Sequence, residues 1–232
     1  MSRRCEEGGG VTANQATGRT GRSAVSSGIR EALAAGDMVP GQRLVEQELS
    51  EVFRATRSSV REALQDLAAE GLVELIPRRG ARVRVISVEE AIQITECRAL
   101  LEGLCARRAA EYASDEVRQE LKGIGSAMSR AVEQGDPDAY SVLNRRLHEC
   151  IGEAGGQKVA QALLDRMNGQ MVRYQFRLAL RPGRPAQSLP QHLAIIDAVL
   201  AGDPEAAEAA ARAHVESVIV ALRETPAPVR LG

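Results

Sequence analysis

The chain of 232 residues is 44% hydrophobic, enough to bury the core of one large domain or of two smaller ones. Only 2% of the residues are aromatic and Trp is absent, so the composition favours helices with an aliphatic core over β-sheet. The formal net charge of -1 gives no overall sign of nucleic-acid binding, and such a function must therefore rest on the local distribution of charge.

No segment of the chain predicts a disulfide framework, a membrane span or a signal peptide. The four cysteines have no CxxC spacing, and we expect reduced thiols, with Cys97, Cys105 and Cys150 as small core residues. No apolar run approaches the roughly 20 residues that cross a bilayer. We therefore expect a cytoplasmic protein without a membrane partner, whose polar residues 1–23 form a disordered arm.

Three helices are predicted after the arm. The first begins near Ala24 and ends at Gly36. The second lies within RLVEQELSEVF, and the third is RSSVREALQDLAAEGL, which Gly71 ends. Apolar residues recur at helical spacing in both, namely Leu44, Leu49 and Val52 in the second helix and Val60, Leu64 and Leu67 in the third.

Two short β-prone runs, LVELIP and ARVRVI, follow the third helix and predict a hairpin with Arg79 and Gly80 at its basic tip. Helices followed by such a hairpin form a winged helix-turn-helix, which we assign to residues 24–86. Basic residues exceed acidic ones between residues 54 and 84. We therefore expect the third helix to enter the major groove of DNA with its N-terminal end, where Arg can pair with O6 and N7 of guanine.

The segment MVPGQRLVEQELSEVFRATRSSVREALQDLAAEGLVELIPRRGARV resembles the DNA-binding domain of the GntR family of bacterial transcription regulators. That family shares a PG turn, a VREAL core, an EGL stop and an RGA wing in this order. The resemblance implies DNA contacts by Arg57 and Arg61 as base readers, Ser58 and Ser59 as phosphate ligands, and Arg79 and Gly80 in the wing. Gln47 stands where a fatty-acid-responsive relative has a further DNA-contacting Arg, so the operator of that relative is not assumed.

Helical patterns near residues 88–112, 115–134, 137–153, 157–180, 187–201 and 204–223 predict an antiparallel bundle over residues 87–225, ahead of a tail at 226–232. This region is similar to the FCD effector domain of the FadR subfamily, and six helices place it nearer the VanR-type branch. The expected fold is mainly α, with a winged helix-turn-helix joined to a helical domain for effector binding and dimerisation.

The three histidines of the chain, His148, His192 and His214, all fall within predicted helices of this bundle. Neutral imidazole is a common metal ligand, and Asn144 lies one helical turn before His148 on the same face. Spacing alone leaves both a metal site and ordinary packed histidines open. In metal-binding FCD domains, an Asp or Asn, a His four residues later and two further His are the ligands, and Asn144, His148, His192 and His214 match these positions in order. The resemblance therefore implies a divalent metal ion, with Zn as the first choice and Ni or another ion as alternatives.

Four neutral ligands leave the charge of a divalent cation uncompensated, so we expect a small carboxylate effector at its open coordination positions. The resemblance places Arg98 facing the pocket, where it can clamp the same carboxylate. The alternative for Arg98 is an i,i+4 ion pair with Glu102.

The sequence therefore predicts a ligand-responsive transcription regulator, a repressor that binds a pseudo-palindromic operator as a homodimer. One alternative keeps the regulator but makes the metal structural and the effector an apolar or acyl compound. The other is a three-His metal-dependent hydrolase. That enzyme would need a general base, and Glu149, the acid next to His148, should point elsewhere on the helix.

Overall fold

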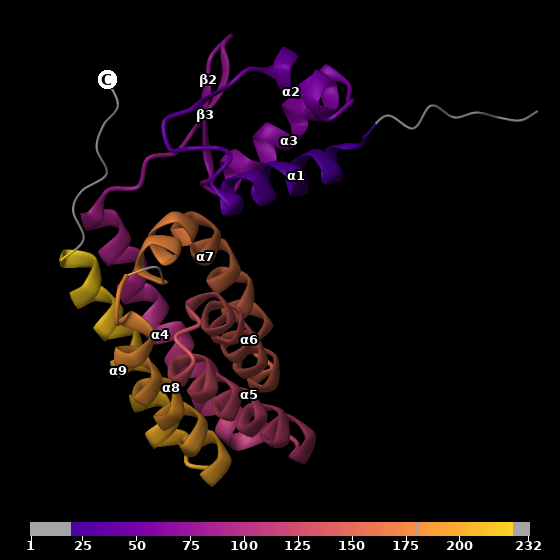
Figure 1. The fold of residues 1–232 in the computed structure, drawn as a ribbon. Coiled ribbons are helices and arrows are strands. Elements are labelled where there is room, and N and C mark those ends of the chain that lie inside the picture. The colour runs from indigo at the N-terminus through magenta and orange to yellow at the C-terminus, as the bar shows by residue number, and fades with distance from the viewer. Residues whose placement is uncertain (1–19, 180, 225–232) are drawn as a thin grey trace, which may run out of the picture.

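Helices form most of the structure, a computed structural model that describes residues 20–179 and 181–224 (Figure 1). The N-terminal elements are α1 (Arg22–Ala35), β1 (Arg43–Leu44), α2 (Glu46–Val52), α3 (Arg57–Ala69), β2 (Val73–Ile76) and β3 (Gly80–Val83). The C-terminal elements are α4 (Val88–Tyr112), α5 (Asp115–Glu133), α6 (Pro137–Gly155), α7 (Lys158–Ala179), α8 (Arg184–Ala201) and α9 (Pro204–Arg223). This architecture confirms the predicted fold class.

The N-terminal elements form a winged helix-turn-helix with its own core. Helix α1 packs against α3, where Val25, Ile29, Val60 and Leu64 are almost fully buried. The three strands pair antiparallel in the order β1-β3-β2 and cover the other side of this core. Helix α3 begins at an N-cap, because the side chain of Thr56 accepts a hydrogen bond from the backbone N–H of Ser59.

Two details of this domain differ from the sequence-based expectation. Leu44 lies in strand β1 rather than in the second helix, because pairing with Ala81 satisfies its backbone and buries its side chain. Val52 is 71% exposed and lies outside the core, since α2 ends there and the next residue, Phe53, packs against the core. The first helix begins at Arg22, two residues before the predicted start, while residues 1–19, most of the predicted arm, and the predicted tail lie outside the described residues.

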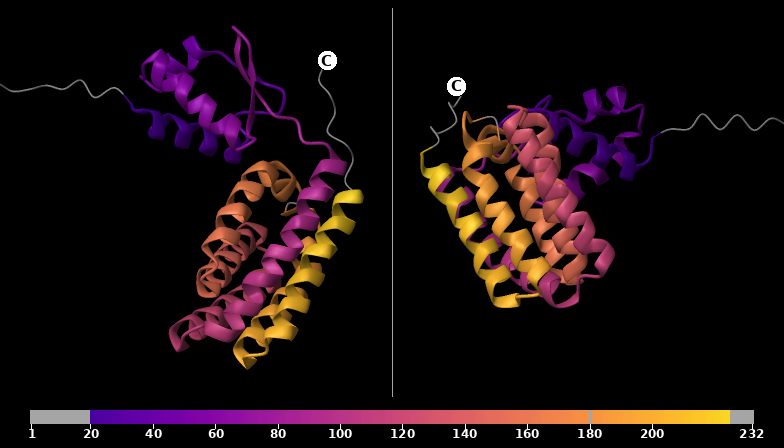
Figure 2. Two further views of the ribbon diagram at one scale, coloured as in Figure 1. Left: turned by 180° about the vertical axis from the view of Figure 1, so that it is seen from behind. Right: turned by 60° about the horizontal axis from the view of Figure 1, so that its bottom comes forward.

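The six C-terminal helices form the predicted bundle (Figure 2). Helix α4 packs against α9 and α6, while α8 packs against α9 and α5. The core is aliphatic, with Cys105 and Cys150 buried in it, whereas Cys97 is exposed on the outer face of α4. Helix α8 starts at Arg184, three residues before the predicted start, because Pro185 is well suited to the first turn of a helix. No helix within the described ranges is long and apolar enough to cross a membrane.

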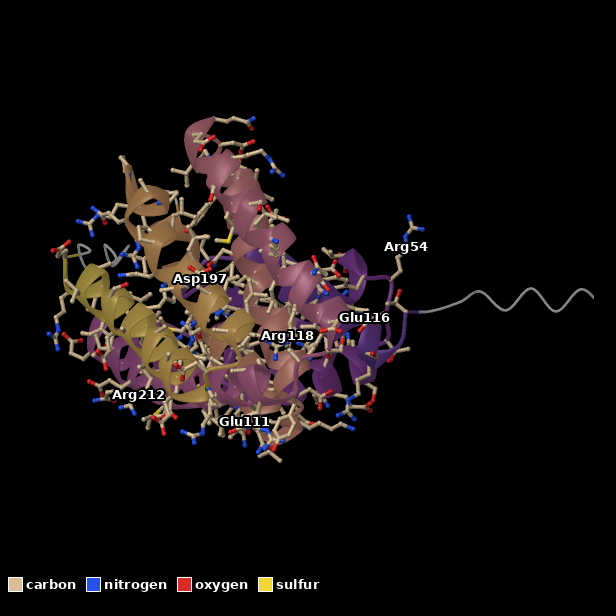
Figure 3. All side chains as sticks on the ribbon, turned by 90° about the horizontal axis from the view of Figure 1, so that it is seen from below. Arg54, Glu111, Glu116, Arg118, Asp197 and Arg212 are labelled. Atoms are coloured by element: carbon tan, nitrogen blue, oxygen red, sulfur yellow. The ribbon has the colours of Figure 1, made fainter. Side chains whose placement is uncertain are left out.

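Arg118 of α5 fixes the end of the bundle that lies away from the winged helix-turn-helix. Its guanidinium donates hydrogen bonds to the carbonyl oxygens of Val199 (2.6 Å), Leu200 (2.9 Å) and Ala110 (3.2 Å). These carbonyls lie in the last turns of α8 and α4, beyond the regular i→i+4 hydrogen bonds of their helices. Figure 3, a view from this end, shows Arg118 among the helices. The contact fixes the end of α8, directly before the turn after which α9 runs back antiparallel to α8.

Helix α7 connects the bundle to the winged helix-turn-helix. Gln170 donates a hydrogen bond of 2.7 Å to the carbonyl oxygen of Glu70, and Arg166 donates one to the carbonyl oxygen of Ala69. Both acceptors lie at the C-terminal end of α3. Two side chains of the bundle therefore cap the helix that carries the predicted base-reading residues.

Candidate metal centre and nucleic-acid interface

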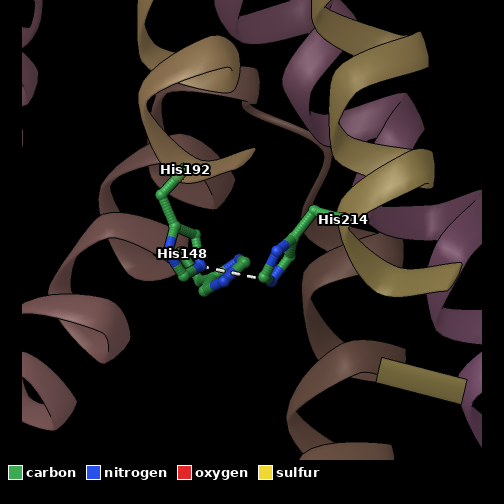
Figure 4. A group of neighbouring side chains, drawn as sticks. All are labelled: His148, His192 and His214. Atoms are coloured by element: carbon green, nitrogen blue, oxygen red, sulfur yellow. Dashed lines mark hydrogen bonds between the residues drawn. The ribbon is translucent and has the colours of Figure 1, made fainter. Parts of the chain in front are cut away.

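Three histidines from three different helices meet inside the bundle. His148 lies on α6, His192 on α8 and His214 on α9, and one ring nitrogen of each lies within 4.8 Å of the others (Figure 4). The Nε2 atoms of His192 and His214 are 3.2 Å apart. Two nitrogens bound to one ion at about 2.0–2.1 Å would be roughly 3.0–3.4 Å apart, so this pair fits two ligands of a single cation.

The corner between α8 and α9 explains why these two rings meet. Gly202 ends α8 in the left-handed conformation (φ 67°), and Asp203 caps α9 with Pro204 in its first turn. So short a connection makes the two helices antiparallel neighbours. His192 lies ten residues before Gly202 and His214 eleven residues after Asp203, so both rings lie at about the same height along the pair.

Each histidine also has a polar neighbour at its second ring nitrogen, Nδ1. The hydroxyl of Tyr140 lies 2.8 Å from Nδ1 of His192, and Oε1 of Gln191 lies 3.2 Å from Nδ1 of His214. A carboxylate oxygen of Glu102 lies 3.2 Å from Nδ1 of His148. Metal-binding histidines usually have such a partner, which fixes the tautomer and leaves the other nitrogen for the ion.

The buried rings are held neutral, as metal ligands must be. Burial lowers the pKa of His192 well below its ordinary value, and the neighbouring His214 and His148 lower it further. Burial likewise lowers the pKa of His214 to about 3, with His148 as the next largest cause. Both rings therefore keep a lone pair at neutral pH. The side chains present fit a cation with nitrogen ligands.

Arg98 and Glu102 form a buried ion pair beside this cluster. Arg98 donates through Nε (3.1 Å) and Nη2 (2.6 Å) to Oε1 of Glu102. Burial alone would raise the pKa of the Glu102 carboxyl, but Arg98 and then His148 outweigh it and hold that pKa well below its usual range. The structure thus shows the i,i+4 ion pair with Glu102 that was the alternative for Arg98. The contact of Arg98 with an effector remains a prediction.

Asn144 lies half-buried on α6, one turn before His148, where the sequence places it. Its role as a fourth ligand remains a prediction. Glu149 is half-exposed and lies 3.8 Å from Arg146, so it points away from the cluster as expected. The acid that does lie beside a histidine is Glu102, which the sequence argument against a hydrolase overlooked.

The predicted base readers lie on the first two turns of α3 and are both tied to side chains of α2. Arg61 donates through Nε (3.1 Å) and Nη2 (2.8 Å) to the two carboxylate oxygens of Glu46. Arg57 donates to Oε1 of Gln47. Because both arginines are exposed, they are accessible to a DNA duplex.

The two predicted phosphate ligands differ in their surroundings. Ser58 is exposed, and its hydroxyl donates to Glu62 (3.1 Å). Ser59 is half-buried, and its hydroxyl lies 2.9 Å from that of the N-cap residue Thr56. A phosphate contact by Ser59 would therefore compete with the cap, whereas Ser58 is more open to DNA.

In the wing, Arg79 is exposed in the turn before β3, and Gly80 begins that strand with a φ of +86°. A Cβ atom at Gly80 would lie 2.3 Å from the carbonyl oxygen of Leu44. Glycine is thus required at this position by the close approach of β1, independently of any contact with the minor groove.

Family models match both halves of the chain. The model described as "Bacterial regulatory proteins, gntR family" matches residues 22–83, and the FCD domain model matches residues 93–217, which is more than half of the chain. The chain belongs to the GntR family and carries an FCD domain. GntR regulators of this kind bind operator DNA and respond to small-molecule effectors through the FCD domain, and they are transcription regulators, not enzymes.

Several GntR relatives are named repressors. The chain is 27% identical over 187 residues to the HTH-type transcriptional repressor RspR of Escherichia coli strain K12, covering 81% of this chain and 82% of that protein. It is 29% identical over 209 residues to the probable D-xylose utilization operon transcriptional repressor of Paenarthrobacter nicotinovorans, covering 88% and 91%. Among solved structures, E. coli McbR/YncC superposes with a TM-score of 0.72 at 20% identity, covering 88% of this chain and 97% of that one, which supports the fold.

The sequence argument missed the partners of the predicted site residues in this GntR protein. Tyr140 was detectable, because it lies four residues before Asn144 and eight before His148 on one face of α6. Glu102 had been considered only as a partner of Arg98. Glu46 and Gln47 could be assigned as partners of Arg61 and Arg57 only once the packing of α2 against α3 was known.

Proposed function

We propose that this GntR regulator is a repressor whose FCD domain binds a divalent metal ion and, at that ion, a small carboxylate effector. The observation that carries the proposal is the convergence of His148, His192 and His214, each with a polar partner at its second ring nitrogen. The assignment as a repressor draws on relatives that are named as repressors.

The metal would be held by the three histidines and by Asn144. The side chains offer nitrogen and amide oxygen donors, a set that suits Zn, with Ni or another ion as alternatives. Because all four ligands are neutral, the ion would supply a positive charge for binding an anion. The nearby Arg98 and Glu102 cancel one another in charge, so the positive charge in this part of the bundle would come from the ion.

An effector bound there would act on DNA binding through a shift between conformations of the protein. Helix α7 offers a physical route, because Gln170 and Arg166 contact the C-terminal end of α3. An effector that favours a different placement of α7 relative to the other helices would move the DNA-binding domain away from the position that fits the operator. We infer that the effector is a carboxylate, because the uncompensated positive charge of the ion would favour an anionic ligand.

The protein is further proposed to bind its operator as a homodimer, so that two α3 helices meet two half-sites about one helical turn apart. The outer face of α4 supports this proposal. Leu100 is 59% exposed and Leu104 is 36% exposed, and with Cys97 they form one stripe on that face. Light scattering should give the mass of a dimer for the wild type and that of a monomer for Leu100→Glu.

The proposal is tested by measuring operator release. Duplexes that bind the metal-loaded protein are first selected from fragmented genomic DNA, and their affinity is then measured by fluorescence anisotropy with and without members of a small-carboxylate panel. The proposal predicts that at least one carboxylate weakens operator binding, and only when metal is present. Release that persists after chelation would instead support a structural metal, and release only by acyl compounds would point to an apolar effector.

A further inference from the structure

Glu46, the first residue of α2, contacts one edge of the Arg61 guanidinium. Its two carboxylate oxygens accept hydrogen bonds from Nε (3.1 Å) and Nη2 (2.8 Å) of Arg61. The two side chains come from different helices, fifteen residues apart in sequence. Despite this two-point contact, the Arg61 side chain is 62% exposed, whereas that of Glu46 is 25% exposed. The contact therefore orients Arg61 without removing it from the surface.

The geometry leaves the part of Arg61 that reads guanine free. A guanidinium has five N–H groups, and Glu46 occupies the one on Nε and one of the two on Nη2. The N–H groups of Nη1 and the second one of Nη2 remain. These form the end of the planar fork, which matches the O6 and N7 acceptors of guanine.

A free arginine on a helix surface samples many rotamers and loses that freedom when it binds a base. Glu46 holds Arg61 in one orientation before DNA arrives, so less freedom is lost on binding. The carboxylate stays charged, because hydrogen bonding to Arg61 lowers the pKa of Glu46. Glu48, two residues further along α2, is exposed and makes no ion pair within the described part of the chain.

We propose that Glu46 is a positioning residue for DNA recognition, which sets the strength of the base preference of Arg61 by orienting its guanidinium. The inference rests on the proposed role of Arg61 as a base reader. Glu46 itself would contact no base. Its negative charge near the DNA would weaken binding to all sequences slightly, and the gain would appear only at the base pair read by Arg61.

The test compares four full-length proteins: the wild type, Arg61→Ala, Glu46→Gln and Glu48→Gln. Each is used to select binders from a library of duplexes with randomised sequence, and the selected pools are sequenced to give the base preference at every position. Glu48→Gln is the matched control, because it removes the same charge from the first turn of the same helix. Melting temperatures confirm that all four proteins fold.

Arg61→Ala should abolish the preference at one base pair of each half-site. Glu46→Gln should weaken the preference at that same base pair by about two- to ten-fold, the cost of ordering one arginine side chain, and leave the other positions unchanged. Glu48→Gln should leave the preferences as in the wild type. Both Gln variants should bind random-sequence duplex slightly more tightly, because both remove a negative charge.

The other outcomes separate the two claims. If Arg61→Ala changes no preference, Arg61 is not a base reader, and both the assignment and the proposal fail. If Arg61→Ala acts as expected but Glu46→Gln matches Glu48→Gln, only the positioning role fails. If Glu46→Gln alters a base pair that Arg61→Ala leaves intact, Glu46 reads a base directly and the proposal is overturned.

Discussion

Oε2 of Glu102 lies 3.2 Å from Nδ1 of His148, while Oε1 of the same carboxylate accepts two hydrogen bonds from Arg98. One buried acid thus links the arginine of α4 to the histidine of α6. Oε2 forms no hydrogen bond of good geometry with the described residues, and its contact with Nδ1 of His148 is one of charge and proximity. If His148 binds the proposed metal ion, we expect Glu102 to orient its ring.

Replacing Glu102 by Gln should weaken metal binding by about 10- to 100-fold, because the carboxylate beside Nδ1 of His148 is lost. Titration of the chelated protein with Zn in the presence of a competing chromophoric chelator measures this affinity. Glu149→Gln is the control, since Glu149 neighbours His148 in sequence but faces outward. Equal affinities for the two variants would show that Glu102 does not support the ion.

Without metal, the protein should lose stability as the pH falls below the ordinary histidine pKa. In the unfolded chain His214 takes up a proton near pH 6.5, whereas in the folded protein burial lowers its pKa to about 3. The contribution of His214 to the free energy of unfolding is therefore fully present above pH 6.5 and is lost as the pH falls toward 3. This residue alone should cost about 1 kcal/mol between pH 7 and 5.5. Urea unfolding of the chelated protein at both pH values measures the difference. His214→Gln should reduce the loss of unfolding free energy between pH 7 and 5.5. A loss as large as in the wild type would show that His214 is not the residue responsible.

Arg57→Ala and Arg61→Ala should each cost roughly 1–3 kcal/mol of operator binding and relax the base preference. Both side chains are exposed on the first two turns of α3. Fluorescence anisotropy on a selected operator measures the loss. Arg130→Ala, which removes the same charge from α5 in the bundle, should bind like the wild type. Wild-type affinity in the two α3 variants would place the base-reading residues elsewhere.

Gln170→Ala should weaken the response of DNA binding to an effector more than DNA binding itself. Gln170 caps the carbonyl oxygen of Glu70 at the end of α3, so its loss removes one of the two side-chain contacts between α7 and α3 without touching the predicted DNA surface. The measurement compares operator affinity with and without effector. Lys158→Ala, at the exposed start of α7, is the control. A full response in Gln170→Ala would exclude this contact as the route of coupling.

Strong local signals made most of the fold predictable. Thr56 and Asp203 are N-cap residues, and Gly36 and Gly202 end their helices in the left-handed conformation, so the boundaries of these helices follow from side-chain chemistry. The errors arose where long-range packing decides the outcome. Leu44 becomes a strand residue only because β3 lies alongside it, and no pattern within its own segment indicates this.

The candidate site was predictable to a similar extent. The chain has only three histidines, His148, His192 and His214. The family resemblance predicted that they bind one ion together, and the bundle brings their rings close to one another. Their partners were harder to find, because Gln191 and Glu102 contact histidines from other helices. Such contacts depend on how helices pack against one another and on side-chain rotamers, and neither follows from periodicity.

The measurement that tests the central claim most directly is a thermal-shift screen of sugar acids, hydroxy acids and dicarboxylates on metal-loaded and on chelated protein. A ligand that binds only the folded state raises the melting temperature as its concentration rises above its Kd. The proposed function predicts a carboxylate whose shift is present with metal, disappears on chelation and is absent from His192→Ala. A shift of equal size in metal-loaded and chelated protein, or none from any carboxylate, would contradict an effector bound at the histidine centre.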